Sequence, residues 1–297
     1  MTDNIYVGAL VSERTFLEHH GILGQKWGVR NGPPYPLSST TRSSAEKKAS
    51  SKRGEQEYGD AVGCAIVLGV YLLPWVAMAG AAAVDSAVKA KQEKKYTADL
   101  NRKREAAGLK LDEATGFYKK KKKTSIEEDT KKVNPRFEES RRKGDDRYTT
   151  NCMLCTTTLE MRRRGYEVEV KPRSAGMYTG SEAVKRWFPD AKTKMYRPEG
   201  NDTYYRDYSK MKNKAKKDIL SQGEGARGNL MFTWQGSAGA GHSVFYEVHN
   251  KKITIIDTQC NRVLPDSNMV FDRASSIVVS RLDNVKFDPN TVKECCR

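Results

Sequence analysis

The chain has 297 residues and a net charge of +16, from 53 Lys and Arg against 37 Asp and Glu. This length suits one sizeable domain with appendages, or two small domains. The basic balance favours anionic partners, but the sequence has no zinc-finger spacing and no stacking-aromatic ribonucleoprotein motif, so nucleic acid is not expected as a specific partner. The densest basic run, Lys119 to Lys123, is expected to be a solvated linker. A membrane-anchored nucleic-acid binder that uses this run is the weakest alternative.

Residues 1–56 are expected to be a flexible N-terminal region. Prolines at positions 33, 34 and 36 interrupt regular structure, and a long polar stretch follows them. One segment, FLEHHGILGQKWGVR from Phe16 to Arg30, instead combines apolar residues, glycines and two histidines. We expect this segment to be a docking motif for a protein partner.

Residues 57–92 contain the most apolar part of the chain. The stretch from Ala61 to Val84 carries no charge, and as a helix it is long enough to span the ~30 Å hydrocarbon core of a bilayer. We therefore predict a transmembrane helix that enters a host membrane. It begins too late and is too long for a signal peptide, so secretion through one is not expected. The alternative is a helical hairpin that turns near Pro74 and packs inside an assembly.

Residues 93–144 are expected to be a charged helical linker. Its first part has the composition of a helix, and the segment GLKLDEATGFY, residues 108–118, is expected to be a loop. Ser125 followed by Glu128 is the pattern of a capping box, which predicts a short helix. We place the domain boundary near Gly144, because the polar segment RRKGDDR surrounds it.

Residues 145–282 are expected to form an α+β domain, followed by a loose tail at 283–297. The run Arg162 to Arg164 is expected to be a solvated helix end that complements the helix dipole. Helical spacing predicts a helix over CTTTLEMRRRG, with Cys152 in its first turn and Gly165 as its C-cap. The same patterns predict a strand at 166–170, helices at 181–189 and 204–223, a strand at 228–234, a mobile glycine-rich loop at 235–241 and a β-hairpin at 242–259.

The cysteines are sparse for a chain of this size, which argues against a disulfide framework. We expect them to be reduced, with the last two in the loose tail, and we expect no cofactor. The six are Cys64, Cys152, Cys155, Cys260, Cys295 and Cys296.

The predicted hairpin brings polar side chains together. If it turns at Asn250-Lys251, a favourable two-residue loop, His242 lies opposite Gln259 and Val244 lies opposite Asp257. Because side chains alternate along a strand, His242, Asp257 and Gln259 then emerge on one face. A carboxylate beside an imidazole holds its tautomer and stabilises its charged form, as in a catalytic triad. A loop of odd length would reverse the alternation and remove this arrangement.

Cys152 is the candidate nucleophile of such a triad. It lies in the first turn of its predicted helix, where the dipole and the unpaired N–H groups favour a thiolate. An adjacent His242 raises the thiolate fraction further. Asn151 or Gln259 is a candidate donor to an oxyanion or a contact to substrate. Cys155, one turn into the helix, is the second-choice nucleophile and is expected to pack beneath Cys152.

Three plainer interpretations of these residues remain open. Cys152, Cys155, His242 and Cys260 offer the ligand types of a zinc site, although structural zinc sites usually combine two close-spaced pairs. The Cys-x-x-Cys spacing also occurs in redox pairs, but these follow a strand of a parallel sheet, which the sequence does not predict. In the third interpretation, His242 is a structural histidine within a strand, with its hydrogen bonds satisfied and no role in chemistry.

The segments NCMLCTTTLEMRRRGYEVEV, GHSVFYEV and IIDTQ resemble the papain-fold toxin family, whose members are thought to be glutamine deamidases or related cysteine hydrolases. The resemblance covers about Asp145 to Val263. It implies a papain-like domain, in which an N-terminal catalytic helix packs on an antiparallel sheet. It also implies a catalytic triad of Cys152, His242 and Asp257.

A second resemblance concerns the front of the chain. HHGILGQKWGVR is similar to a short motif near the N-terminus of structural proteins from phages and prophages of Gram-positive bacteria. SIEEDTKKVNPRF, ahead of the cysteine helix, is similar to a joint in such proteins. These similarities imply a virion-associated protein that docks on head or portal components through Phe16 to Arg30.

Together these observations predict a phage- or prophage-encoded cysteine hydrolase that acts on amide bonds. Its partner would be a protein with an exposed Gln or other amide, and the same chemistry serves deamidation, proteolysis and isopeptide cleavage. It would be found in the virion or in the host cell, and at the host membrane after release. The competing prediction is a non-catalytic minor capsid or internal virion protein whose papain-like domain is a binding module.

Overall fold

A computed structural model describes the backbone of residues 61–174, 176–177, 179–198, 208–237 and 239–297, and the side chains of these residues from position 84 onward. The expected flexible region at 1–56 and its docking motif, Phe16 to Arg30, lie outside the described residues. The described chain is a mixture of helices and antiparallel strands, which confirms the expected α+β class.

Helix α3 (Ala61–Ala106) runs without interruption past Pro74. The alternative of a hairpin that turns near Pro74 is therefore wrong. Among the described residues, no helix is long and apolar enough to cross a bilayer. The side chains of residues 61–83 lie outside that description, so the membrane helix expected at Ala61 to Val84 stays a prediction.

The folded domain begins earlier in the chain than expected. Contacts group Arg102 to Arg297 into one compact unit, whereas the part of α3 before Arg102 belongs to another. The predicted boundary near Gly144 is therefore wrong, and the second half of the predicted linker is part of the domain. In this half, residues 108–118, expected as a loop, contribute to a two-stranded antiparallel hairpin. Its strands are β1 (Lys110–Asp112) and β2 (Phe117–Lys119).

The capping box is present as predicted. Ser125 accepts a hydrogen bond from the backbone N–H of Glu128, whose carboxylate accepts one from the backbone N–H of Ser125. Because this motif satisfies two backbone donors at the helix start, it marks the first residue of α4 (Ile126–Lys131). Helix α5 (Phe137–Lys143) follows and ends at Gly144, whose left-handed conformation closes the last turn.

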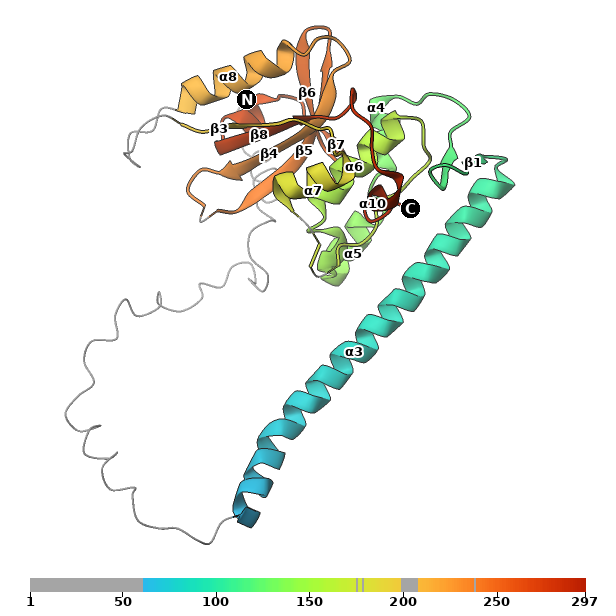
Figure 1. Ribbon diagram of the computed structural model, residues 1–297, viewed down its shortest axis with the longest axis vertical. Helices are drawn as coiled ribbons and strands as arrows, with labels where there is room; N and C mark the ends of the chain where they lie inside the picture. Colours follow the sequence, from blue (N-terminus) through green and yellow to red (C-terminus); the bar gives the residue numbers. More distant parts are fainter. Residues whose placement is uncertain (1–60, 175, 178, 199–207, 238) are drawn as a thin grey trace, which may run out of the picture. The chain divides into compact units, whose positions relative to one another are not determined.

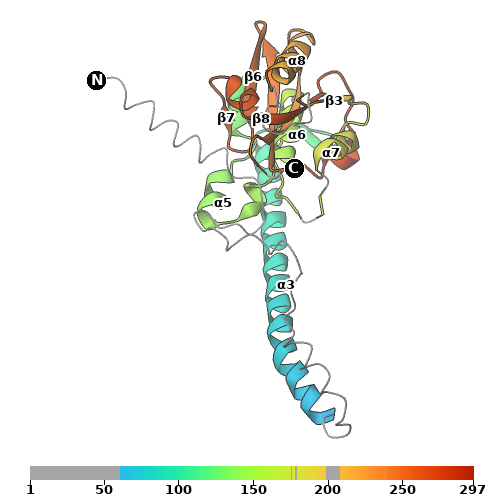
Figure 2. The ribbon, with the colours of Figure 1, turned by 90° about the vertical axis from the view of Figure 1, so that its left-hand side faces the viewer.

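The centre of the domain is a six-stranded sheet in which every neighbouring pair is antiparallel (Figures 1 and 2). The strand order is β3-β8-β4-β5-β6-β7. The strands are β3 (Thr193–Tyr196), β4 (Arg227–Trp234), β5 (Gly241–His249), β6 (Lys252–Asp257), β7 (Arg262–Val263) and β8 (Ala274–Arg281).

Helices cover both faces of this sheet (Figure 1). Alternation along the strands divides the apolar side chains, so that Phe232 and Val244 pack in the cluster of α8 (Tyr208–Leu220), whereas Phe245 and Ile256 pack in the cluster of α6 (Cys152–Arg163). The remaining helices are the single turn η1 (Asp146–Tyr148), α7 (Gly180–Trp187), α9 (Asn268–Phe271) and α10 (Pro289–Val292).

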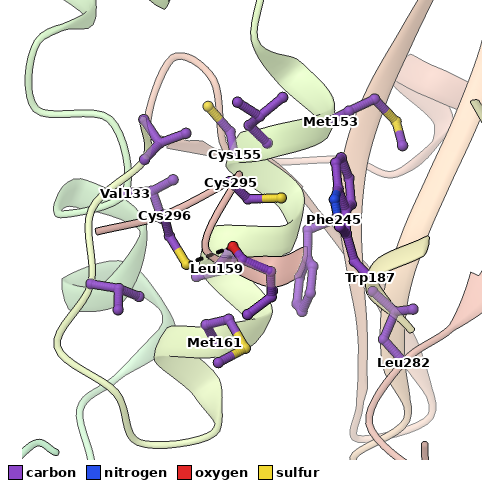
Figure 3. Packing of buried hydrophobic residues seen from close by; sticks show 14 of the residues in the cluster. Val133, Met153, Cys155, Leu159, Met161, Trp187, Phe245, Leu282, Cys295 and Cys296 are labelled. Atoms are coloured by element: carbon purple, nitrogen blue, oxygen red, sulfur yellow. Dashed lines mark hydrogen bonds between the residues drawn. The ribbon is translucent and has the colours of Figure 1, made fainter. Parts of the chain in front are cut away.

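The segment at 283–297 is an integral part of the core, so the prediction of a loose tail is wrong. Cys295 and Cys296 are buried in the same cluster as Cys155 (Figure 3). The backbone of residues 166–170 is held partly by this segment through a bridge between Val170 and Cys296, and partly by a bridge to β2. Residues 166–170 therefore form two isolated bridges rather than the expected strand.

The arginine run at the end of α6 is not a solvated helix end. Arg162 is fully buried and donates to Asp129 at 3.1 Å, to Glu167 at 3.1 and 3.2 Å and to the carbonyl oxygen of Val168 at 2.7 Å. Lys120, predicted to lie in a solvated linker, is also buried and pairs with Asp129. A buried charge requires such partners, so these ion pairs tie α4 and the β1–β2 hairpin to α6.

The other two arginines of the run also form ion pairs. Arg163 donates to Glu247 on β5 at 3.0 Å. Arg164 donates to Glu160, one turn earlier in α6, at 2.6 Å. Because Glu160 also accepts from Arg227 on β4 at 2.9 Å, this carboxylate connects the helix with the sheet. All three side chains therefore fix the position of α6.

Candidate active site

Helix α6 presents Cys152 as its first residue. The preceding residue, Asn151, is the N-cap but makes no side-chain capping bond. The first backbone N–H groups of a helix have no partner within it, and the positive end of the dipole lies beside them. Cys152 is half-buried, whereas Cys155 is fully buried beneath it. Of these two residues, the one at the helix start is therefore the more exposed.

Strands β5 and β6 supply the imidazole and the carboxylate. Asn250 and Lys251 both have positive φ values, of 51° and 57°, and form the predicted two-residue turn. The resulting register brings Nε2 of His242 to 3.1 Å from Oδ2 of Asp257, both side chains being almost fully buried. The predicted contact between these two side chains is therefore present. The aromatic ring of Phe232 packs edge-on against the imidazole, with centroids 6.0 Å apart.

Cys152 and His242 interact directly. Burial opposes ionisation of the thiol, but a hydrogen bond and charge attraction from His242, together with a hydrogen bond from the backbone N–H of Ser243, outweigh burial. The pKa of Cys152 is therefore lowered. Burial also opposes protonation of the imidazole, but the charge of Asp257 and hydrogen bonds to Asp257 and Cys152 raise the pKa of His242 to about 10. Both shifts favour a thiolate–imidazolium pair.

Asn151 and Gln259 meet as well, although not in the expected way. Strand β6 ends at Asp257, so Gln259 lies in a turn and does not oppose His242 on the sheet. Its backbone N–H donates to Oδ1 of Asp257 at 3.2 Å, and its side-chain Nε2 donates to Oδ1 of Asn151 at 3.4 Å. The Nδ2 of Asn151 is buried and has no hydrogen-bond partner in the described part of the chain.

The other cysteines near the site have a different character. Burial raises the pKa of Cys155 and that of Cys260 well above the ordinary value, and the charge of Asp257 acts in the same direction on both. In the described residues, no three side chains of His, Cys, Asp or Glu are arranged to hold a metal ion. The geometry therefore distinguishes Cys152 from Cys155 and does not support the zinc interpretation.

The glycine-rich segment before His242 reaches the site through a close backbone contact. A Cβ atom on Gly241 would lie 2.7 Å from the carbonyl oxygen of Phe232, so only glycine fits between β4 and β5 here. The hydroxyl of Ser237 donates to the carbonyl oxygens of Trp234 and Ala240 and holds the turn. The predicted mobility of this loop stays a prediction.

His249, the other described histidine, differs from His242. It lies at the hairpin turn, is largely exposed, and its Nδ1 is 2.6 Å from Oε1 of Glu224. An exposed pair of this kind contributes little to stability. His242 therefore differs from His249 in that its pair with a carboxylate is buried, packs against an aromatic ring and lies beside a thiol.

Sequence reasoning missed one residue that touches this site. Asn134, in the loop after α4, is fully buried and donates through Nδ2 to the carbonyl oxygens of Tyr148 and Gln259. The only local signal is that Asn134 precedes Pro135, which favours an extended or turn conformation at Asn134 but does not indicate its hydrogen-bond partners.

Comparison with protein-family models, curated proteins and solved structures found no match to this chain.

Proposed function

We propose that this protein is a papain-like cysteine hydrolase that acts on an amide bond, with Cys152 as nucleophile, His242 as acid and base, and Asp257 as the group that orients His242. The observation that carries this proposal is the contact of one half-buried thiol at a helix start with a buried imidazole that a carboxylate holds. Such a constellation is recognised by geometry and roles rather than by sequence position.

The proposed reaction begins with the thiolate of Cys152, which attacks the carbonyl carbon of the amide. Because Nε2 of His242 faces Asp257, the nitrogen that serves Cys152 is Nδ1. The imidazolium gives its proton to the leaving nitrogen, the C–N bond breaks, and ammonia or an amine departs from a thioester on Cys152. Water then attacks the thioester as His242 takes its proton, and the acid product and the free thiol are released.

The oxyanion formed in each step needs donors. We assign this role to the first backbone N–H groups of α6 and to Nδ2 of Asn151, which is buried and has no hydrogen-bond partner among the described residues. Gln259 supports this donor, because its Nε2 bonds to Oδ1 of the same amide and so orients it.

The substrate we propose is a protein carboxamide, that of a Gln side chain or of a peptide or isopeptide bond. The setting we propose is a phage or prophage particle, with docking through Phe16 to Arg30 and membrane contact through Ala61 to Val84 after release. The proposed substrate rests on the resemblance of the cysteine helix, and the proposed particle and docking rest on the resemblance of the N-terminal motif. The proposed membrane contact rests on the apolar composition of Ala61 to Val84.

A second function from another class is a non-catalytic virion protein with a papain-like binding domain. The near-complete burial of His242 and Asp257 favours it, since a satisfied buried pair also stabilises a core without chemistry. The two functions differ in what they predict for the thiol. Only the hydrolase needs a reactive Cys152.

The test is alkylation of the full-length protein by iodoacetamide from about pH 5 to about pH 9, read at each cysteine by mass spectrometry. The hydrolase predicts fast labelling of Cys152 near pH 6, and slower labelling in His242→Ala. Labelling of His249→Ala, the control histidine, should match the wild type. Slow labelling of Cys152 at the same rate in the wild type and in His242→Ala would rule out the ion pair and favour the binding module.

A further inference from the structure

Asn134 joins the two segments that carry the thiol and the carboxylate. It is fully buried in the loop between α4 and α5, and its Nδ2 donates at 2.9 Å to the carbonyl oxygen of Tyr148 and at 2.8 Å to that of Gln259. Tyr148 lies four residues before Cys152, and Gln259 lies two residues after Asp257. One side-chain amide therefore bridges the approach to α6 and the exit from β6.

The backbone of Asn134 is held by the same exit loop. Its N–H donates to Oδ1 of Asn261 at 3.0 Å, and its carbonyl oxygen accepts from Nδ2 of Asn261 at 2.8 Å. This reciprocal pair imitates the exchange of hydrogen bonds between neighbouring strands. Asn261 adopts a left-handed conformation with φ of 58°, which Asn tolerates better than most residues. Asn134 is thus fixed to the exit loop at three points.

The side-chain contacts to Asn151, one from Gln259 and one from Asn134, are longer. Gln259 Nε2 lies 3.4 Å from Oδ1 of Asn151, at the far end of the range for a hydrogen bond, and Nδ2 of Asn134 lies 3.5 Å from the same oxygen. The short bonds that hold the two segments together in this network are those of Asn134 to the two carbonyls. An aspartate at this position would present oxygen to two carbonyl oxygens and would repel both.

We infer that Asn134 is a positioning residue, which sets the distance between Cys152 and the His242–Asp257 pair and steadies the amide of Asn151. This inference rests on the proposed function, because it concerns the same site. Asn134 does not touch a reacting atom; it acts through the carbonyl groups of Tyr148 and Gln259. Groups that act as nucleophile and base need alignment to a fraction of an ångström, and supporting hydrogen bonds supply it.

The variant that tests this inference is Asn134→Ala in the full-length protein, compared with Thr130→Val. Thr130 is an equally buried residue on the adjacent α4, and its hydroxyl bonds only to the carbonyl oxygen of Ile126 among the contacts described. Both variants lose hydrogen bonds of a buried side chain in the same region. A general loss of stability is therefore common to both, and a loss of positioning is specific to Asn134→Ala.

The readout is the pH profile of Cys152 alkylation by iodoacetamide in folded protein. We expect its midpoint to rise by about one pH unit in Asn134→Ala, which is roughly a tenfold loss of reactivity on the acid side of the profile. We expect Thr130→Val to keep the wild-type midpoint. Asn261→Ala, which removes two backbone bonds but leaves the Asn134 side chain, should give a smaller shift in the same direction.

The possible results separate this inference from the proposed function. A wild-type Cys152 whose reactivity does not depend on His242 overturns both. A reactivity that depends on His242 but has the same midpoint in Asn134→Ala overturns only the positioning role. If Asn134→Ala fails to fold, an unchanged midpoint in Asn261→Ala overturns it instead.

Discussion

Oδ2 of Asp257 lies 3.1 Å from Nε2 of His242, and the two residues come from strands that a two-residue turn joins. The other carboxylate oxygen accepts from the backbone N–H of Gln259. Both oxygens of the buried carboxylate are thus engaged, which fixes its plane and that of the imidazole. In the proposed mechanism this pair determines which imidazole nitrogen meets Cys152.

We expect Asp257→Asn to abolish the acid-side reactivity of Cys152. The amide keeps the shape of the carboxylate but removes the charge that raises the pKa of His242, so the imidazolium is no longer favoured. Alkylation near pH 6 should fall at least about tenfold. The free energy of unfolding should fall by about 3 kcal/mol or more, because the buried histidine loses its charged partner. Urea unfolding measures the second effect, and an alkylation rate equal to that of wild type would contradict the first.

Selective labelling among the cysteines follows from opposite pKa shifts. The pKa of Cys152 is lowered, so its thiolate is present at a lower pH than that of an ordinary thiol. Burial raises the pKa of Cys155, Cys260 and Cys295 well above the ordinary value and that of Cys296 to about 12, so these four stay protonated up to pH 9. Among these five cysteines of the described chain, iodoacetamide should modify Cys152 first in native protein.

The control for this selectivity is the unfolded state, in which all cysteines should label at similar rates. Cys155→Ser should leave the Cys152 rate unchanged, because Cys155 is the buried neighbour and not the nucleophile. Equal native labelling of Cys152 and Cys155 would contradict the assignment.

Arg162 should be among the residues that matter most for stability outside the site. Arg162→Met leaves the buried carboxylate of Asp129 without one of its cationic partners, and removing one member of a buried ion pair costs about 3–5 kcal/mol. The matched control is Arg141→Met, whose partner Glu138 is exposed, and which should change stability by less than about 1 kcal/mol. Chemical unfolding of both variants checks this, and equal losses would contradict the role given to burial.

The hairpin turn offers a stabilising substitution. Lys251 has φ of 57°, which costs an L-residue roughly 1–2 kcal/mol relative to glycine. Lys251→Gly creates the Asn-Gly sequence that this turn type prefers, so the free energy of unfolding should rise by about 0.5–1 kcal/mol. Lys252→Gly, one residue later within β6, should instead lower it. A decrease in both variants would show that the turn has another conformation.

Short-range patterns were sufficient for several elements. The capping box predicted the start of α4, and the alternation of residues 242–259 predicted the hairpin with its turn at Asn250 and Lys251. These succeed because turn chemistry and strand alternation act over a few residues. The start of α6 was predicted to within its first turn, in which Cys152 was expected and where it lies.

Other expectations failed because burial depends on distant partners. Arg162 is typical of a solvated helix end in its own context, yet Asp129, 33 residues earlier, makes it a core residue. The segment around Cys295 has no periodic pattern of its own, and it is ordered by contact with α6 and residues 166–171. Residues 166–170 alternate as a strand does, but in the described chain they make only isolated bridges and no strand pairs with them along their length.

By itself, the sequence determined the α+β class, the hairpin and its turn, the cysteine at a helix start, and the pairing of His242 with Asp257. Each of these depends on neighbours in the chain. Only the tertiary structure decided that Cys152 meets His242, that Gln259 leaves the sheet, and that Asn134 connects the two segments across 125 positions. The physical reason is that a buried polar group is stable only with its hydrogen-bond partners, and here those partners come from remote parts of the chain.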